Sequence, residues 1–208
     1  CLVLAGFVFY RPDRLDDGLA RITVMDAGQG LSVWVQTRNR NLLFDTGTAQ
    51  AAQTGIVPSL NAMGVRRLDK LILSHHDSDH DGGLDAVSDI EIGETLAGQP
   101  EFYPTAKFCA EAQWQWDGVD FELLRSSENP VGEDNDRSCV LRIVSDGQAL
   151  LVTGDLGVKG EAGLVERYGS SLYSQVLILG HHGSNTASSG GFLNTVAPKY
   201  AVASSGYA

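Results

Sequence analysis

Residues 74–83 read Ser-His-His-Asp-Ser-Asp-His-Asp-Gly-Gly and directly follow the apolar run of residues 68–73. The apolar run predicts a buried strand, and the short polar residues and glycines after it predict a tight turn. Within six positions of this turn, His75, Asp77, Asp79 and His80 supply two imidazoles and two carboxylates as candidate ligands. Such a mixture of nitrogen and oxygen donors is typical of divalent metal sites. The alternative is a solvated turn that is rich in Asp and His by chance.

Polar groups also follow three other predicted strands. They are Asp45-Thr46-Gly47, Thr153-Gly154-Asp155 and Gly180-His181-His182-Gly183-Ser184. A single Asp after a strand is most often a turn residue or a helix cap. All five His of the chain, however, fall within residues 75–80 and 181–182. The recurrence of such groups at four strand ends favours one shared site at the rim where the strands end.

The hydrophobic pattern predicts two runs of strands, each followed by alternating helices and strands. Strands are expected over residues 21–26, 31–37, 41–45, 68–73, 119–124, 139–144, 149–153, 175–179 and 199–204. Helices are expected over residues 55–64, from 82 onward, within 158–168 and over 188–197, and residues 93–118 look irregular. Two sheets packed face to face with helices outside accommodate this order best. The predicted fold is therefore α/β, a four-layer αββα sandwich.

The composition fits one domain with a sizeable core, because the chain has 208 residues and 43% of them are hydrophobic. The formal net charge of −11 argues against nucleic-acid binding by charge alone, since proteins that bind in that way are basic. Two divalent cations would add about four positive charges where a substrate lies. The acidity therefore weighs less against a metal-dependent nuclease.

The three cysteines, Cys1, Cys109 and Cys139, match no zinc-finger spacing. Cys109 and Cys139 either pair in an oxidising compartment or remain two buried thiols. Residues 1–10 are almost wholly apolar but too short to span a bilayer, which takes about 20 residues. They fit a buried strand or the end of a transmembrane helix, and we favour the second. We expect residues 1–14 to be the tail of a preceding membrane segment or linker, and 15–208 to form the domain.

Taken together, the motifs resemble the metallo-β-lactamase superfamily over about residues 21–208. Asp45-Thr46-Gly47 is similar to its first motif, His75-x-Asp77-x-Asp79-His80 to its main metal motif, and Asp155 to its bridging aspartate. Within the superfamily the chain most resembles the C-terminal domain of ComEC-type competence proteins, which are inner-membrane DNA-uptake channels. Four segments carry this resemblance: residues 26–30 (Asp-Ala-Gly-Gln-Gly), 73–83, 151–155 and 180–186.

The sequence departs from the family pattern at several positions. Asp77 replaces the usual second His of the superfamily, as in the competence group. No His lies between His80 and His181, so the third-motif His is absent, and a loop containing Asn135 and Ser138 stands in that region. Residues 31–32 are Leu-Ser where the competence family commonly has Asp-Ala. The family also continues to a Gly-His-Pro segment without counterpart here, so we expect a truncated domain that lacks one metal ligand.

The resemblance implies a metal-dependent hydrolase with two divalent ions. The expected ligands are His75, Asp77 and Asp155 for one ion and Asp79, His80 and Asp155 for the other. Asp79 would also orient the attacking water, and either His181 or His182 would protonate the leaving oxygen. The weight of carboxylates favours manganese, although zinc or magnesium would also fit.

The resemblance further implies that the substrate is DNA and that the domain degrades the non-transported strand during uptake. The expected location is the bacterial inner membrane, with this domain on the periplasmic side. The expected partners are the channel portion of the same protein and other competence proteins. Trp34, Trp114 and Trp116 would either stack on bases or pack in the core. Two alternatives are a hydrolase of an ester, thioester or lactone and a non-catalytic domain associated with a channel.

Overall fold

The first sheet begins as an antiparallel meander and continues as parallel strands. In the computed structural model, which describes residues 14–127 and 134–206, β1 (Arg21–Val24), β2 (Val33–Gln36) and β3 (Asn41–Phe44) form the meander. Parallel to β3 then come β5 (Lys70–Leu73), β7 (Thr95–Ala97) and β8 (Lys107–Phe108). The continuous apolar run in β5 reflects burial on both faces of a parallel strand. Ile72 faces the other sheet, and Leu71 and Leu73 face the helices.

The second sheet repeats this plan in the second half of the chain. Four antiparallel strands, β9 (Ala112–Trp116), β10 (Val119–Leu124), β11 (Val140–Ser145) and β12 (Gln148–Val152), are followed by parallel β13 (Val176–Ile178) and β14 (Tyr200–Val202). The hairpin between β11 and β12 turns at Asp146-Gly147, both with positive φ (49° and 69°). Two central residues with positive φ match the right-handed twist of the flanking strands.

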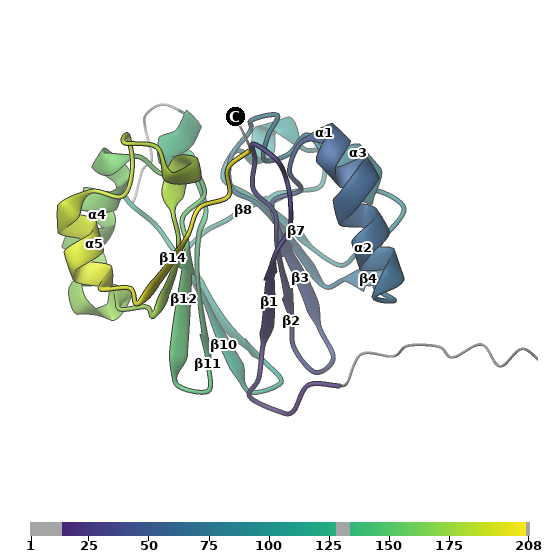
Figure 1. Ribbon diagram of the computed structural model, residues 1–208, viewed down its shortest axis with the longest axis horizontal. Helices are drawn as coiled ribbons and strands as arrows, with labels where there is room; N and C mark the ends of the chain where they lie inside the picture. The colour runs from purple at the N-terminus through teal and green to yellow at the C-terminus, as the bar shows by residue number, and fades with distance from the viewer. Residues whose placement is uncertain (1–13, 128–133, 207–208) are drawn as a thin grey trace, which may run out of the picture.

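Helices cover the outer face of each sheet, and the predicted four-layer αββα sandwich is confirmed (Figure 1). On the first sheet lie α1 (Ala49–Ala51), a π-helical turn (Ala52–Ile56), α2 (Val57–Ala62) and α3 (Leu84–Val87). On the second lie α4 (Val158–Tyr168) and α5 (Gly190–Val196). Two-residue strands β4 (Arg67–Leu68) and β6 (Glu91–Ile92) pair beside the first sheet. Within residues 14–127 and 134–206, no helix has the length and apolar character that a membrane span requires.

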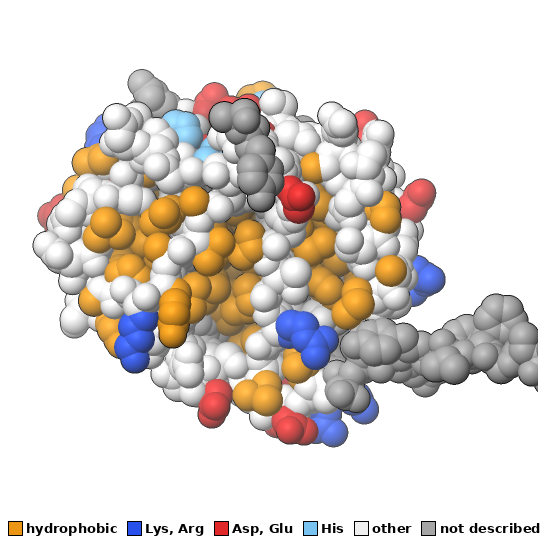
Figure 2. All heavy atoms as spheres, viewed as in Figure 1, with side chains coloured by type: hydrophobic (Ala, Val, Ile, Leu, Met, Phe, Trp, Pro, Cys, Tyr) orange, Lys and Arg blue, Asp and Glu red, His pale blue; other side chains and the backbone are white. Residues whose placement is uncertain are grey.

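The apolar side chains form three clusters: one between the sheets and one under the helices of each outer layer. Phe44 and Phe121, both fully buried, belong to the cluster between the sheets. Figure 2 shows that this cluster is open on one side, where apolar side chains gather between the edge strands β1 and β14. Ile22 and Val24 of β1 and Val202 of β14 pack against this cluster and are only partly buried.

The prediction of an irregular segment at residues 93–118 is wrong. This segment contributes β7, β8 and β9, which have only two to five residues each. Strands of two or three residues are too short to show a hydrophobic period, and whether such a segment forms a strand depends on the neighbouring strands with which it pairs. The expectations for residues 1–13 and for the loop at 128–133 lie outside the described residues.

The ends of the parallel strands place the four polar motifs at one rim. β3 and β5 run parallel and end before Asp45 and Ser74, while β12 and β13 run parallel and end before Thr153 and Leu179. Since parallel strands share one direction, the motifs after them meet at one edge of the sandwich.

We predict that Phe121→Ala lowers the free energy of unfolding by about 3–5 kcal/mol, because the cavity it leaves lies between two sheets that cannot both collapse. The matched control is Phe102→Ala. The Phe102 side chain is 51% exposed, so its loss should change stability by about 0.5 kcal/mol or less. Urea unfolding followed by circular dichroism measures both. Equal losses in the two variants would contradict this packing.

Candidate metal centre

Asp45 is the fully buried anchor of the site. It lies directly after β3 with φ 58°, a left-handed conformation that turns its carboxylate toward the neighbouring strand end. The carboxylate accepts bonds from the Ser74 amide (2.6 Å) and the Ser74 hydroxyl (2.7 Å). It also accepts a bond from Nδ1 of His80 (2.8 Å). Asp45 therefore fixes the strand end that precedes the His-Asp turn and one imidazole of that turn.

Three imidazoles are held in the same way, each through Nδ1. The Ser74 hydroxyl gives its one proton to Asp45, so it accepts from Nδ1 of His75 at 3.0 Å. Nδ1 of His80 donates to Asp45, and Nδ1 of His182 donates to the Ser204 carbonyl oxygen at 2.8 Å. In all three rings Nε2 faces the inside of the cluster and remains as the atom that could bind a metal ion. Metal-binding His residues show this pattern, with the second nitrogen bonded to a carboxylate, carbonyl or hydroxyl.

Two carboxylates complete the cluster. Asp155, directly after the Thr-Gly that follows β12, lies 3.1 Å from Nε2 of His80 and 3.4 Å from Nε2 of His182. Asp79 lies 3.0 Å from Nε2 of His182. Close packing holds the turn that carries Asp79: a Cβ added to Gly30 would lie 2.4 Å from the Asp79 carbonyl oxygen. Only glycine therefore allows residues 30–31 to approach this turn.

The donor atoms form two overlapping groups that fit divalent metal ions. His75, His80 and Asp155 make one group, and Asp79, His80 and His182 make the other. In each group the ligand atoms lie within 4.8 Å of one another. Nε2 of His75 is buried and has no hydrogen-bond partner among the described residues. A buried imidazole nitrogen with a free lone pair is costly without a partner, and a metal ion would satisfy it.

The structure brings together four of the five residues expected to bind metal: His75, Asp79, His80 and Asp155. Asp77 is exposed, and one of its carboxylate oxygens accepts from the Ser78 amide at 2.6 Å. It belongs to neither group, so its role as a ligand stays a prediction. His182 takes a place among the ligand atoms instead. His182 joins Asp79 and His80, the pair for which the sequence comparison predicts a missing His ligand.

His181 and His182 occupy different environments although they are adjacent. The His182 side chain lies between Asp79 and Asp155 and is 6% exposed, whereas the His181 side chain is 37% exposed. Nδ1 of His181 lies 2.8 Å from the Thr186 hydroxyl, and the ring lines a hollow of about 440 Å³. Both residues have positive φ (49° and 54°), an unfavourable conformation that surrounding contacts must stabilise. The geometry makes His181 the better candidate for proton donation and His182 for metal binding.

Electrostatics divide the imidazoles into one neutral and two charged groups. Burial lowers the pKa of His75, and repulsion from His80 lowers it further. Burial also opposes the charge on His80, yet Asp45 and Asp155 raise its pKa to about 10. In His182, Asp155 and Asp79 outweigh burial and raise the pKa to about 9.

The two carboxylates respond in the opposite direction. The hydrogen bond from His182 keeps the pKa of Asp79 below its usual value. Burial of Asp155 acts the other way, but His182 and His80 hold its pKa well below the ordinary range. Without metal, the cluster is therefore a set of internal ion pairs.

Sequence patterns alone assign no role to the residues that hold the candidate ligands. They identify Asp45 only as part of a strand-end motif, and Ser74 only as the residue before His75. Ser204 orients His182 through its carbonyl oxygen and donates its hydroxyl to the Gly30 carbonyl oxygen at 2.6 Å. The position of Ser74 directly before the His-Asp turn is a signal that could have been used. Nothing local marks a backbone carbonyl 22 residues beyond its partner.

We predict that the metal-free protein is most stable near pH 6.5. The lowered pKa of His75 removes stability as the pH falls below about 6.5, because the unfolded chain then takes up a proton that the folded imidazole does not. The raised pKa values of His80 and His182 stabilise the fold fully below about pH 6.5, and this stabilisation is lost as the pH rises toward about 9 and 10. The lowered pKa values of Asp79 and Asp155 stabilise it above about pH 4 and cease to do so as the pH falls.

Melting temperatures measured in chelator from pH 4 to 9.5 test this prediction. Asp155→Asn should remove most of the decline above pH 6.5. Manganese chloride should raise the melting temperature most above pH 7, because metal ions bind the neutral imidazole. A flat profile from pH 6 to 9.5 in chelator would contradict the charge assignment.

Comparison with known proteins agrees with this geometry. The sequence profile of the metallo-beta-lactamase superfamily matches residues 25–207. The chain is 70% identical over 207 residues to "Competence protein ComA" of Neisseria gonorrhoeae, covering all of this chain and 30% of that protein. It is 35% identical over 216 residues to "Recombination protein 2" of Haemophilus influenzae, covering 99% of this chain and 26% of that protein. The chain thus spans under a third of the length of these relatives.

Solved structures share the fold at low sequence identity. Metallo-beta-lactamase SMB-1 superposes with a TM-score of 0.61 and 14% identity, covering 91% of this chain and 94% of that one. The predicted likeness to competence proteins is confirmed by the sequence matches. The family match supports divalent metals and metal-dependent hydrolysis. This chain belongs to the metallo-beta-lactamase superfamily.

Proposed function

We propose that this domain is a metal-dependent phosphodiesterase that degrades DNA during uptake by a competence system. One observation carries the proposal: three imidazole Nε2 atoms and two carboxylates converge at the rim, and each imidazole is fixed through Nδ1. The names of the similar proteins, which concern competence and recombination, support DNA as the substrate.

The residues divide the chemistry between them. His75, His80, His182, Asp79 and Asp155 would hold the cations. Bound divalent ions lower the pKa of coordinated water to about 7 and polarise a phosphoryl oxygen. His181, partly exposed beside the hollow and 3.9 Å from Asp155, would donate a proton to the leaving oxygen. With two carboxylates beside three imidazoles, manganese or zinc suits the site, and we favour manganese.

An aromatic pair beside the metal turn favours a substrate with bases. The Phe102 ring stacks on His76, with centroids 4.0 Å apart and planes inclined by 21°. His76 lies between His75 and Asp77, and its Nδ1 is 2.5 Å from Asp81. Tyr103, next to Phe102, donates to the same carboxylate at 2.6 Å. The largely exposed Phe102 ring is thereby fixed to the turn that carries the ligands.

The tryptophans do not provide this platform. Trp34 is 3% exposed and donates its indole N–H to Asn41 (3.2 Å), so of the two expected alternatives this residue packs in the core. Trp114 and Trp116 pack against Phe121, with ring centroids 5.1 Å and 5.3 Å away. Their rings contribute to the core between the sheets.

The disulfide between Cys109 and Cys139 supports an extracytoplasmic location. Disulfides form and persist in oxidising compartments such as the periplasm. We therefore propose that the domain faces the periplasm, that the remainder of a longer protein forms the channel in the inner membrane, and that other competence proteins deliver the DNA.

We predict that Asp79→Ala abolishes manganese-dependent cleavage of single-stranded DNA while the fold remains. Removing a residue that only hydrogen-bonds to a metal ligand lowers metal affinity or activity by about 10–100-fold. Removing a side chain that itself binds the metal should therefore lower the rate of cleavage by about 100-fold or more. Asp85→Ala, which removes an exposed Asp from α3, is the control. Unchanged cleavage by the Asp79 variant would overturn the metal site. Hydrolysis of an ester, thioester or lactone without any cleavage of DNA would overturn the assignment of DNA as the substrate.

We predict that Phe102→Ala weakens binding of a single-stranded oligonucleotide by about 5- to 100-fold, because stacking on one base is worth about 1–3 kcal/mol. Fluorescence anisotropy in chelator measures this binding without cleavage. Phe102→Trp should preserve it, and Tyr173→Ala, which removes an exposed ring before β13, should not change it. An abasic oligonucleotide should bind the parent and Phe102→Ala equally. Equal affinity of both for the normal oligonucleotide would show that Phe102 does not contact the bases.

A further inference from the structure

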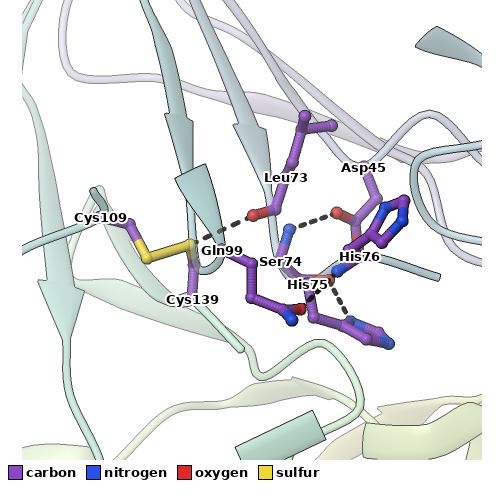
Figure 3. Close-up of a disulfide and its surroundings, with 8 residues drawn as sticks. All are labelled: Asp45, Leu73, Ser74, His75, His76, Gln99, Cys109 and Cys139. Atoms are coloured by element: carbon purple, nitrogen blue, oxygen red, sulfur yellow. Dashed lines mark hydrogen bonds between the residues drawn. A yellow bond between two sulfur atoms is a disulfide. The ribbon is translucent and has the colours of Figure 1, made fainter. Parts of the chain in front are cut away.

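The disulfide joins the two sheets at the rim that carries the metal cluster. Cys109 directly follows β8, the outermost strand of the first sheet, and Cys139 directly precedes β11 in the second. Their Cα atoms are 6.0 Å apart, and both residues are buried. Figure 3 shows the bond beside Leu73 and Ser74, where β5 ends and the His-Asp turn begins. This cross-link is therefore next to the residues that orient the ligands.

Both cysteines bond directly to this part of the first sheet. The Cys139 amide donates to the Ser74 carbonyl oxygen at 3.0 Å. The Cys109 amide donates to the Ala97 carbonyl oxygen at 3.0 Å, and Ala97 pairs with Leu73 in the sheet. The Cys139 sulfur also lies 3.3 Å from the Leu73 carbonyl oxygen. In the disulfide this sulfur carries no proton, so the approach is a packing contact.

Ser74 connects the cross-link to the imidazoles. Its amide and hydroxyl both donate to Asp45, and its hydroxyl oxygen lies 3.0 Å from Nδ1 of His75 and 3.3 Å from Nδ1 of His80. Cys139 is thus separated from two candidate ligands by a single residue. A shift of the Cys139 backbone would move Ser74, and with it the direction of Nε2 in His75.

The surroundings leave Ser74 little room to adjust. A Cβ added to Gly98 would lie 2.3 Å from the Ser74 carbonyl oxygen and 2.2 Å from that of Arg137. A Cβ added to Gly154 would lie 2.7 Å from the Ser74 Cβ and 3.2 Å from the Ser138 Cβ. Residues 137–139 and Ser74 are therefore in direct contact between two glycines. Displacement of one of these segments must displace the other.

We propose that the Cys109–Cys139 disulfide is a positioning element of the metal centre, which acts through Ser74 and makes tight metal binding depend on the oxidised state. Oxidation of the two thiols transfers two electrons and two protons to a disulfide-exchange oxidant and forms the sulfur–sulfur bond. A dithiol reductant reverses this step and itself becomes a disulfide. The proposal rests on the metal site of the proposed function, but not on its substrate. It implies that the domain acquires its metal only where thiols are oxidised.

Manganese binding measured by calorimetry on the 208-residue chain tests the proposal. A Cys1→Ser background leaves Cys109 and Cys139 as the only thiols. We expect the dissociation constant to rise by about 10- to 100-fold after reduction with dithiothreitol, which is the range for loss of an outer-shell partner. Reoxidation should restore tight binding. The Cys109→Ala/Cys139→Ala variant should bind weakly in both conditions.

Two controls separate positioning from general stabilisation. Leu60→Ala, in the buried face of α2, should lower the melting temperature without changing the affinity for manganese. In a Ser74→Ala background, manganese binding should already be weaker than in the parent. Reduction should then raise the dissociation constant by less than about twofold further, since the effects of residues that act along one path are not additive. Circular dichroism below the melting temperature verifies that each variant is folded.

The outcomes distinguish this inference from the proposed function. Equal manganese affinity of the oxidised and reduced protein would overturn the positioning role, whether or not DNA is cleaved. A fully additive effect of reduction in the Ser74→Ala background would overturn the path through Ser74. Redox-dependent manganese binding by a protein that cleaves no DNA would support the positioning role and overturn the proposed substrate. Absence of manganese binding in both states would overturn both.

Discussion

The buried carboxylate of Asp45 is the interaction on which the rest of the site depends. A charged group with no exposure is tolerated only if it is fully hydrogen-bonded, and Asp45 receives three bonds from Ser74 and His80. These bonds connect the end of β3 to the end of β5 and to the turn after it. An unpaired buried carboxylate would be costly, so a single arrangement of the turn, in which all these bonds form, is favoured. This arrangement also sets the orientation of the imidazoles on the turn.

The metal centre concentrates charges that would be unfavourable if they were separate. Asp79 and Asp155 lie within about 3 to 3.5 Å of protonated imidazoles in the metal-free cluster. A divalent cation held by these residues would take the place of the imidazole protons as the partner of the same carboxylates, so metal binding would be coupled to proton release. Asp45, Ser74 and Ser204 already hold the three imidazoles through Nδ1. Exchange of protons for a metal ion would therefore require little rearrangement of the side chains. Such preorganisation is what a hydrolytic metal site needs.

The superfamily fold and the particular chemistry of this chain come from different parts of the sequence. The sandwich depends on apolar positions that many sequences satisfy, which explains how solved relatives at 14–16% identity share it. The chemistry depends on a few strand-end residues. In this chain these residues place His182 among the candidate ligand atoms and leave Asp77 outside both groups, with a disulfide at the same rim. The resulting donor set consists of three imidazole nitrogens and two carboxylates.

The sequence by itself determined the sandwich, the rim and most of the donor atoms. Strand periodicity and the polar residues after each strand are local signals, so the longer strands, the Asp146-Gly147 hairpin and His75, Asp79, His80 and Asp155 could be predicted from them. Local signals could not assign the two- and three-residue strands of residues 93–118, because their partners alone stabilise them.

Only the tertiary structure decided which of the two adjacent imidazoles joins the cluster of candidate ligands. His181 and His182 are equivalent in sequence, and the contact of His182 with the Ser204 carbonyl oxygen separates them. The tertiary structure also decided between paired cysteines and free thiols, and it placed Ser74 between the disulfide and the ligands. Each of these outcomes depends on contacts between segments far apart in the chain, whose distance no local pattern encodes.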